Sequence, residues 1–313
     1  MSPATDNTEC LADSGTDTGV RIKIGHALRD ARTRLRDIST SPQLDAEILL
    51  GHVLKASRSR LRTRLDEHLD ASHGQRFSAL LARRIRGEPI AHLTGEREFW
   101  SLPLHVTRDT LIPRPETEHL VEVALAHLTP DRDLRAADLG TGSGAIALAL
   151  AKERPRCRIV ASDISQAALA VARGNARRLG LANIKFRHGH WCSTLSGEAF
   201  DLIASNPPYV KRGDARMEQD GLQYEPELAL IAGESGLESL HTVITEAWRH
   251  LRVGGMLVVE HGFDQEQTVF NLFASCGYDD ITAYKDLAGL PRGVSGRRLS
   301  RHTRRYTTRA APL

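Results

Sequence analysis

The sequence predicts an α/β protein in which an open, mostly parallel sheet carries helices on both faces. Three observations support this fold class. Strand-like and helix-like segments alternate from about residue 136 to residue 285, which is typical of parallel strands joined by crossover helices. A glycine loop, Gly140–Gly144, follows the first of these strands directly. Only helical periodicity precedes about residue 87, so a small helical bundle is expected in front of the sheet.

The length and composition indicate an ordinary globular protein. The 313 residues are long for one domain and comfortable for two, with 41% hydrophobic and 26% charged residues. The net charge of +3 says little about partners. No signal peptide or membrane-spanning run is read. The cysteines lack metal-ligand spacing, so we expect a reducing compartment, the cytoplasm; they are Cys10, Cys157, Cys192 and Cys276.

The N-terminal part is predicted to be a polar tail followed by a helical domain. Residues 1–19 contain few large apolar groups, and we expect them to be disordered. Residues 20–92 show apolar side chains at three- and four-residue steps, with helices expected after Ile22, from Ser41 and over 71–86. A basic run in this domain is interpreted as a solvated face; its members are Arg58, Arg60, Arg62 and Arg64.

Residues 93–115 are predicted to form a β-hairpin linker between the two domains. Short extended segments, 98–100 and 104–106, flank a turn that contains Pro103. The proline-rich segment 111–115 marks the expected junction, and a helix is predicted over 117–128.

Residues 116–295 are predicted to form a ligand-binding α/β domain. A strand over 136–139, the glycine loop and a helix over 145–152 match the start of a nucleotide-binding unit. The second strand, 158–162, ends at Asp163, where a carboxylate would accept hydrogen bonds from ribose hydroxyls. The glycines at 140, 142 and 144 do not match G-x-G-x-x-G. The loop therefore favours an adenosyl ligand without a pyrophosphate.

Alternation continues to the end of this domain. Further strands are predicted over 184–187, 200–205, 256–260 and 280–285, and further helices over 165–179, 239–251 and 264–275. Glycines at 293 and 296 interrupt the last strand-like segment, so that strand is expected to be short. Residues 296–313 form a basic tail that we interpret as a solvated end. Glu260-His261 is interpreted as the structural end of a strand, and His188 with His190 as a surface pair without a metal.

Asn206-Pro207-Pro208-Tyr209 is the stretch with the clearest chemical meaning. The prolines end the strand at Asn206 and stiffen the chain, because proline lacks an N–H and restricts its predecessor. The Asn206 side chain and the Pro207 carbonyl offer two acceptors, and Tyr209 offers a flat face. A planar NH2 group fits this arrangement, since two accepted N–H bonds would hold its nitrogen in place.

These residues together resemble class I S-adenosylmethionine-dependent methyltransferases that methylate planar amino groups. The resemblance rests on Asp138–Gly144 and Asn206–Tyr209. It narrows to the PrmC/HemK family through further motifs at 86–95, 97–100, 111–118, 225–226 and 260–262. It covers about residue 22 to about residue 290. The fold it implies is a Rossmann-like methyltransferase sheet behind a small helical bundle and a hairpin.

The resemblance also implies an activity and a set of site residues. The family methylates the side-chain amide nitrogen of the glutamine in the GGQ motif of peptide chain release factors. The residues that would bind S-adenosylmethionine are Gly140, Thr141, Gly142, Ser143, Gly144, Asp163, Trp191 and Asn206. Those that would hold the glutamine are Asn206, Pro207, Pro208 and Tyr209, with Asn206, Pro207 and Tyr209 as the catalytic group. Because all cofactor motifs lie beyond Asp138, we expect the helical domain and the hairpin at Phe99-Trp100 to recognise the protein substrate.

Other functions remain open at this stage. A ribosomal-protein glutamine methyltransferase would share the same loop. A DNA adenine-N6 methyltransferase would present a similar amine, but the sequence shows no sizeable basic target-recognition region. A non-catalytic adenosyl-binding module would be expected to lose Asn206 or the prolines. We therefore expect a monomer that acts on release factors and not on nucleic acid or membranes.

Overall fold

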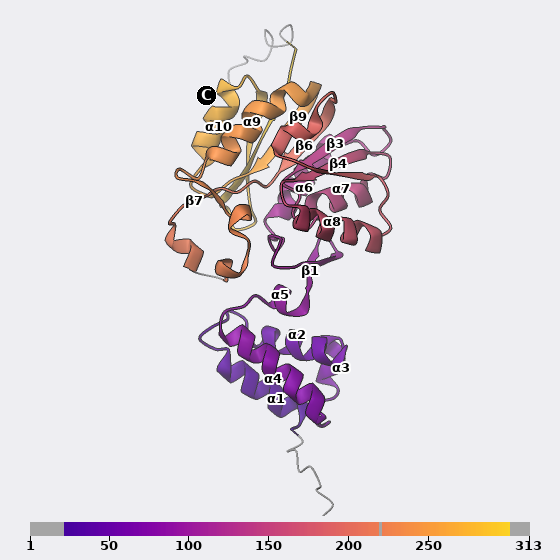
Figure 1. Cartoon of the computed structure of the whole chain (residues 1–313), viewed down its shortest axis with the longest axis vertical. Helices are drawn as coiled ribbons and strands as arrows, with labels where there is room; N and C mark the ends of the chain where they lie inside the picture. Colours follow the sequence, from indigo (N-terminus) through magenta and orange to yellow (C-terminus); the bar gives the residue numbers. More distant parts are fainter. Residues whose placement is uncertain (1–21, 219–220, 301–313) are drawn as a thin grey trace, which may run out of the picture. The chain divides into compact units, whose positions relative to one another are not determined.

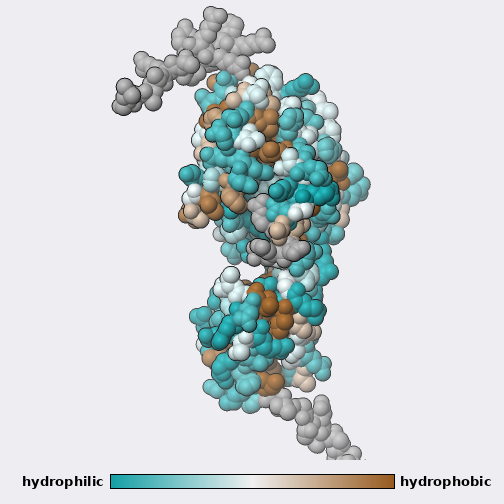
Figure 2. Space-filling view, turned by 90° about the vertical axis from the view of Figure 1, so that its left-hand side faces the viewer, coloured by the Kyte–Doolittle hydropathy of each residue, from teal (hydrophilic) through white to brown (hydrophobic). Residues whose placement is uncertain are grey.

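The computed structural model describes residues 22–218 and 221–300, and the chain divides after Arg86 into two compact units (Figure 1). The predicted tail 1–19 and most of the predicted tail 296–313 lie outside the described residues. None of the helices in the described ranges has both the length and the hydropathy of a membrane span. In Figure 2, hydrophobic side chains form small groups on a mostly hydrophilic surface.

The first unit is a bundle of helices, as the periodicity predicted. Its members are α1 (Ile24–Arg34), α2 (Pro42–Leu54), α3 (Arg58–Arg62) and α4 (Ala71–Ile85). The short helix α3 was missed, because the basic run hides a helical turn that buries Leu61 completely. The carboxylate of Glu47, which is only 3% exposed, accepts a hydrogen bond from Arg58 Nε at 2.8 Å. One side of the run is therefore tied to a buried acid, while Arg62 stays largely exposed.

The second unit is built on a seven-stranded sheet in the order β10-β11-β9-β6-β3-β4-β5. The strands are β3 (Arg135–Leu139), β4 (Arg158–Asp163), β5 (Ile184–His188), β6 (Phe200–Ser205), β9 (Leu251–Glu260), β10 (Asp279–Lys285) and β11 (Pro291–Arg297). Neighbours from β5 to β9 are parallel, whereas β11 runs antiparallel to β9 and to β10. The predicted α/β class is confirmed.

Helices cover both faces of this sheet (Figure 1). They are α6 (Thr117–His127), α7 (Ala145–Glu153), α8 (Gln166–Arg178), α9 (Glu238–His250) and α10 (Glu266–Ser275). Buried residues of α6 and α7 share one apolar cluster with β3 and β6, and residues of α9 and α10 share another on the opposite side. Because successive side chains of a strand point to opposite faces of the sheet, the strands contribute residues to two separate cores.

The last strand, β11, is longer than the sequence suggested. It runs for seven residues, and it pairs with β9 from Gly293 opposite Glu260 to Arg297 opposite Met256. The expectation of a short strand was wrong. The glycines do not interrupt the strand, and Gly296 allows a neighbouring helix to pack closely against it. A Cβ on Gly296 would lie 2.7 Å from the Phe273 ring, so only glycine lets α10 approach the strand. The predicted tail therefore begins inside the sheet.

The hairpin belongs to the core of the second unit. Its strands, β1 (Glu96–Phe99) and β2 (Leu102–His105), are antiparallel and follow a short helix, α5 (Ile90–Thr94). Phe99, Leu102 and Leu104 are at most 4% exposed and join the cluster of α6 and α7. The structure therefore has its division at Arg86, and the segment predicted as a linker packs as part of the sheet domain.

The hairpin turn places two non-glycine residues in the left-handed region. Trp100 has φ 52° and Ser101 has φ 53°. The Trp100 backbone N–H donates to Glu118 Oε1 at 2.7 Å, and its indole N–H donates to Glu153 Oε1 at 3.1 Å. Two carboxylates from α6 and α7 thus hold the turn in a conformation that L-residues disfavour.

We predict that Ser101→Gly stabilises the protein. Ser101 is exposed, and glycine accepts its positive φ without the Cβ clash, so the free energy of unfolding should rise by about 0.5–1 kcal/mol. Thermal unfolding measures the change. Ser101→Ala is the matched control, since it removes the hydroxyl but keeps the Cβ. An equal gain in both variants would contradict the backbone explanation.

Candidate active site

The candidate site lies where three neighbouring parallel strands end. The glycine loop follows β3, Asp163 ends β4, and Asn206 follows β6. Because β3 pairs with both β4 and β6, with Leu139 opposite Ser162 and Ser205, these ends lie side by side. In open parallel sheets this edge is the usual place for a ligand.

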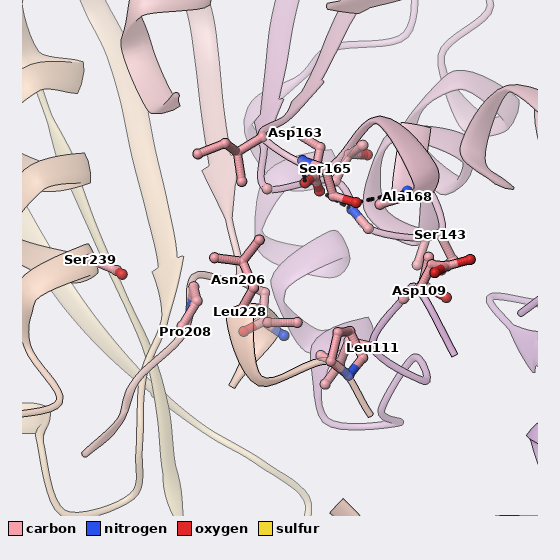
Figure 3. Close-up of a pocket in the computed structure, with 18 of the residues that line it drawn as sticks. Asp109, Leu111, Ser143, Asp163, Ser165, Ala168, Asn206, Pro208, Leu228 and Ser239 are labelled. Atoms are coloured by element: carbon pink, nitrogen blue, oxygen red, sulfur yellow. Dashed lines mark hydrogen bonds between the residues drawn. The ribbon is translucent and has the colours of Figure 1, made fainter. Parts of the chain in front are cut away.

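A cavity of about 330 Å³ opens at this edge (Figure 3), within the range of small-molecule sites. Eight of the predicted site residues line it: Gly140, Thr141, Gly142, Ser143, Asp163, Trp191, Asn206 and Pro208. Gly144, Pro207 and Tyr209 do not line it. Its apolar side is formed by Leu111, Pro226 and Leu228, which sequence reasoning did not select from the residues alone.

A buried carboxylate holds the glycine loop. Asp138 is fully buried, and its Oδ2 accepts hydrogen bonds from Thr141 Oγ1 at 2.6 Å and the Ala147 N–H at 3.1 Å. Burial raises the pKa of Asp138 to about 7. Among the described residues its Oδ1 has no hydrogen-bond partner. The Trp191 ring packs closely against the loop, since a Cβ on Gly140 (φ 72°) would lie 3.2 Å from it.

Asp163 joins the glycine loop to the start of α8. Its Oδ2 accepts from the Gly142 N–H at 2.9 Å and its Oδ1 accepts from the Ser165 N–H at 2.8 Å (Figure 3). Ser165 in turn caps α8 by accepting from the Ala168 N–H. Burial raises the pKa of Asp163. The carboxylate is thus fixed in direction at the cavity wall.

Trp191 forms the wall beyond Gly140. It has φ 40° and begins a short 3₁₀ helix, η1 (Trp191–Leu195), after β5. Its ring packs against the apolar cluster under α9, and the His190 ring meets it edge-on with centroids 5.6 Å apart. His188 Nε2 contacts the Ile164 carbonyl oxygen at 2.9 Å. These two histidines therefore have local partners in this wall.

Asn206 and Tyr209 are tied to one buried carboxylate. The Asn206 side-chain NH2 donates to Thr117 Oγ1 at 3.1 Å, and the Thr117 hydroxyl donates to Glu260 Oε2 at 2.6 Å. The Tyr209 hydroxyl donates to Glu260 Oε1 at 3.1 Å. The expectation that Tyr209 offers a flat face to the site is not met here, because its ring packs into the core toward this acid. Pro207 is also buried.

A second buried acid fastens the apolar side of the cavity. Glu225 Oε2 accepts from the Ile112 N–H at 2.8 Å, and Glu225 Oε1 pairs with the Arg114 guanidinium. The Glu225 side chain is completely buried. The segment around Leu111 is thereby joined to the segment that carries Pro226 and Leu228.

Asn175 connects the glycine loop with the hairpin. On α8, it is 1% exposed, accepts from the His105 N–H at 2.8 Å, and donates to the carbonyls of His105 and Ser143 at 2.9 Å each. Sequence reasoning missed this residue. The available signal was an amide on the alanine-rich face of a predicted helix, where it must find partners when buried.

Two family models match the chain. The PrmC N-terminal domain model covers residues 26–95, and the methyltransferase small domain model covers residues 118–220. The first therefore spans the helical bundle together with α5, and the second spans the glycine loop, Asp163 and Asn206–Tyr209.

Curated relatives extend the match over most of the chain. A protein of Coxiella burnetii named release factor glutamine methyltransferase is 47% identical over 277 residues, which are 88% of this chain and 99% of the relative. The protein of that name from Escherichia coli is 46% identical over 87% of this chain and 98% of its own length.

Among solved structures, the catalytic domain of hMettl16, in complex with an RNA hairpin, matches with a TM-score of 0.52 and 16% identity. The match covers 71% of this chain and 83% of that one, and it supports the fold alone. The fold, the domain matches and the identity to curated relatives agree. The chain therefore belongs to the family of release factor glutamine methyltransferases, with a PrmC N-terminal domain and a class I methyltransferase domain.

Proposed function

We propose that this protein methylates the side-chain amide nitrogen of the glutamine in the GGQ motif of class I peptide chain release factors, with S-adenosylmethionine as methyl donor. The observation that carries the proposal is the position of Asn206 in the cavity wall, between the glycine loop and an apolar side. The names of relatives at 46–47% identity support the same substrate.

The residues present fit the cofactor. The glycine loop admits close backbone approach, and Asp163 presents a fixed carboxylate to ribose hydroxyls. Trp191 would cover the adenine, and the unpartnered Oδ1 of Asp138 lies beneath the loop. When bound, S-adenosylmethionine supplies a methyl group on a sulfonium. Asn206 would contact both the cofactor and the substrate.

On the substrate, the chain's task is positioning. An amide nitrogen is a poor nucleophile because its lone pair is delocalised. The Asn206 carbonyl oxygen and the Pro207 backbone carbonyl would accept its two N–H bonds, which fixes the nitrogen and stabilises developing positive charge. Pro208 would border the glutamine, while Tyr209 would support the loop through Glu260. A strong general base is not required, since the proton leaves after the nitrogen has gained the methyl group.

The partner is a release factor, and we propose that the protein works as a monomer in the cytoplasm, where translation takes place. The helical unit over 22–86 would recognise the protein substrate, because the glycine loop, Asp163 and Asn206 all belong to the other unit. No nucleic-acid substrate is proposed.

The direct test is incubation with labelled S-adenosylmethionine and, side by side, purified release factor, ribosomal protein and DNA, followed by identification of the modified residue. Label on the GGQ glutamine is expected, and replacement of that glutamine in the release factor should abolish it. Label on ribosomal protein or DNA alone would overturn the proposal.

We predict that Asp163→Ala weakens S-adenosylmethionine binding by about 10- to 100-fold, because hydrogen bonds to a charged acceptor contribute about 1.5–3 kcal/mol. Calorimetry measures the affinity. Asp109→Ala is the matched control, since Asp109 is an exposed residue at the same cavity whose carboxylate accepts a local hydrogen bond from Thr107 Oγ1 at 3.2 Å. Unchanged affinity in Asp163→Ala would remove the ribose assignment.

We predict that Asn206→Ala lowers the single-turnover rate by about 10²–10³-fold at saturating cofactor, since it removes one preorganised acceptor. Cofactor affinity, measured separately, should fall far less. The same rate in the variant and in wild type would exclude this loop from the chemistry.

We predict that a fragment starting at Gly87 keeps cofactor binding and loses methylation of the intact release factor. The fragment retains the hairpin, whose apolar residues belong to the core of the sheet domain. Calorimetry can follow cofactor binding. A fragment that modifies release factor at the full rate would refute the role of the helical unit.

A further inference from the structure

We propose that Thr117 and Glu260 are positioning residues that fix which side of the Asn206 amide faces the cavity. This inference rests on the proposed function of Asn206 as an acceptor for the target amide. Neither residue was expected to take part: Glu260 was interpreted as the end of a strand, and Thr117 as the start of a helix.

The three side chains form one chain of hydrogen bonds, in which Asn206 is half-buried and the other two are buried. Thr117 is 4% exposed and Glu260 is 3% exposed, so neither exchanges partners freely with water. Thr117 begins α6, Glu260 ends β9, and Asn206 follows β6. The bonds run from the Asn206 NH2 to Thr117 Oγ1 (3.1 Å) and from the Thr117 hydroxyl to Glu260 Oε2 (2.6 Å).

The direction of these bonds follows from counting hydrogens. A carboxylate only accepts, and a threonine hydroxyl has a single hydrogen. That hydrogen is used on Glu260, so Thr117 Oγ1 can only accept from Asn206. The NH2 group of the Asn206 amide must therefore face Thr117. The carbonyl oxygen remains as the atom that Asn206, which lines the cavity (Figure 3), can offer to a ligand.

The second oxygen of Glu260 secures the arrangement. Oε1 accepts from the Tyr209 hydroxyl at 3.1 Å, so both ends of the Asn206–Tyr209 loop are held by one carboxylate. Burial raises the pKa of Glu260, and the hydroxyl donors together with the positive charge of Arg292 oppose that rise. A neutral acid could donate to Thr117 and reverse the chain. The geometry supports the accepting form, since a hydroxyl group lies within hydrogen-bond distance of each Glu260 carboxylate oxygen and each hydroxyl can donate.

The consequence is a preference for ligands that donate at this point. With the carbonyl oxygen presented, Asn206 attracts an N–H of an amide or aromatic amine. With the amide reversed, it would present its own NH2 to that N–H, and two donors would face each other. The chain of bonds therefore selects the hydrogen-bonding class of the target atom through Asn206, with Thr117 itself also in the cavity lining.

The first test removes the Thr117 hydroxyl, which determines the orientation of the Asn206 amide. Thr117→Val keeps the shape and removes the hydroxyl, and it should lower kcat about tenfold or more with little change in cofactor affinity. Thr117→Ser should recover most of the loss. Tyr278→Phe, which removes a buried hydroxyl that donates to the Ile244 carbonyl at 2.9 Å and does not line the cavity, is the control and should show a smaller loss. A wild-type kcat in Thr117→Val would overturn the proposal.

The second test exchanges the polarity of the chain. Asn206→Asp places two acceptors on one hydroxyl, so its rate should fall to the level of Asn206→Ala. The double variant combines Asn206→Asp with Glu260→Gln. There, the new amide at position 260 donates its NH2 to Thr117 and accepts from Tyr209 with its carbonyl oxygen, while the Thr117 hydroxyl donates to the new carboxylate at position 206. The three bonds, from Tyr209 to position 260, between positions 260 and 117, and between positions 117 and 206, are all formed again, and an acceptor faces the cavity.

We expect the double variant to exceed Asn206→Asp about tenfold in single-turnover rate at pH 8. A merely structural role of Glu260 predicts the opposite, since a second lesion would then add to the first. A double variant no faster than Asn206→Asp would overturn the proposal.

A readout that needs no turnover separates this inference from the proposed function. In ¹⁵N spectra of the full chain, the Asn206 side-chain NH2, identified by its loss in Asn206→Ala, should exchange slowly with water in wild type and rapidly in Thr117→Val. Equal exchange in both would refute the chain of bonds. A wild-type protein that shows this protection but leaves release factor unmodified would refute the proposed substrate alone.

Discussion

The carboxylate of Glu260 is the group on which the geometry of the strand edge depends. It is almost completely buried at the end of β9, and burying a charge without partners is costly. Two hydroxyl groups donate to it, one from Thr117 at the start of α6 and one from Tyr209 after β6. Three elements that are far apart in sequence must therefore meet at one place for the acid to be accommodated. The position of the loop at Asn206 is therefore set by the hydrogen bonds that Glu260 requires.

Other loops around the cavity are held in the same way. Asp138 fastens the glycine loop, Asn175 fastens the hairpin to Ser143, and Glu225 fastens the segment at Ile112. Each is a buried polar side chain that bonds a backbone group or hydroxyl of another segment. Hydrogen bonds of this kind are stronger in a buried, weakly polar environment. A conformation that leaves one of these polar groups without a partner is correspondingly unfavourable in free energy. The cavity is consequently shaped by irregular segments, yet these segments are constrained nearly as firmly as the strands.

The strengths and failures of the sequence prediction follow from the range of the interactions involved. The strand before Gly140 and the loop at Asn206 were predictable, because apolar runs, glycines and prolines act on their immediate neighbours. The length of β11 was not predictable, because Gly296 is needed for close packing against Phe273, which belongs to another element. The bond of the Tyr209 hydroxyl was not predictable for the same reason: its buried partner, Glu260, lies 51 positions away in the chain.

This difference in range also separates the two halves of the site. The glycine loop and Asp163, which face the proposed cofactor, lie at or directly after the ends of β3 and β4, so local motifs reveal them. The opposite wall is formed by Leu111 and Leu228, which are brought together only through Glu225 and its long-range bonds. Asn206 stands between the two, set in place by prolines from its own loop and oriented by Thr117 from a distant one. A local motif can therefore indicate the class of cofactor and of reacting nitrogen, whereas the apolar wall opposite is assembled only when distant segments of the chain fold together.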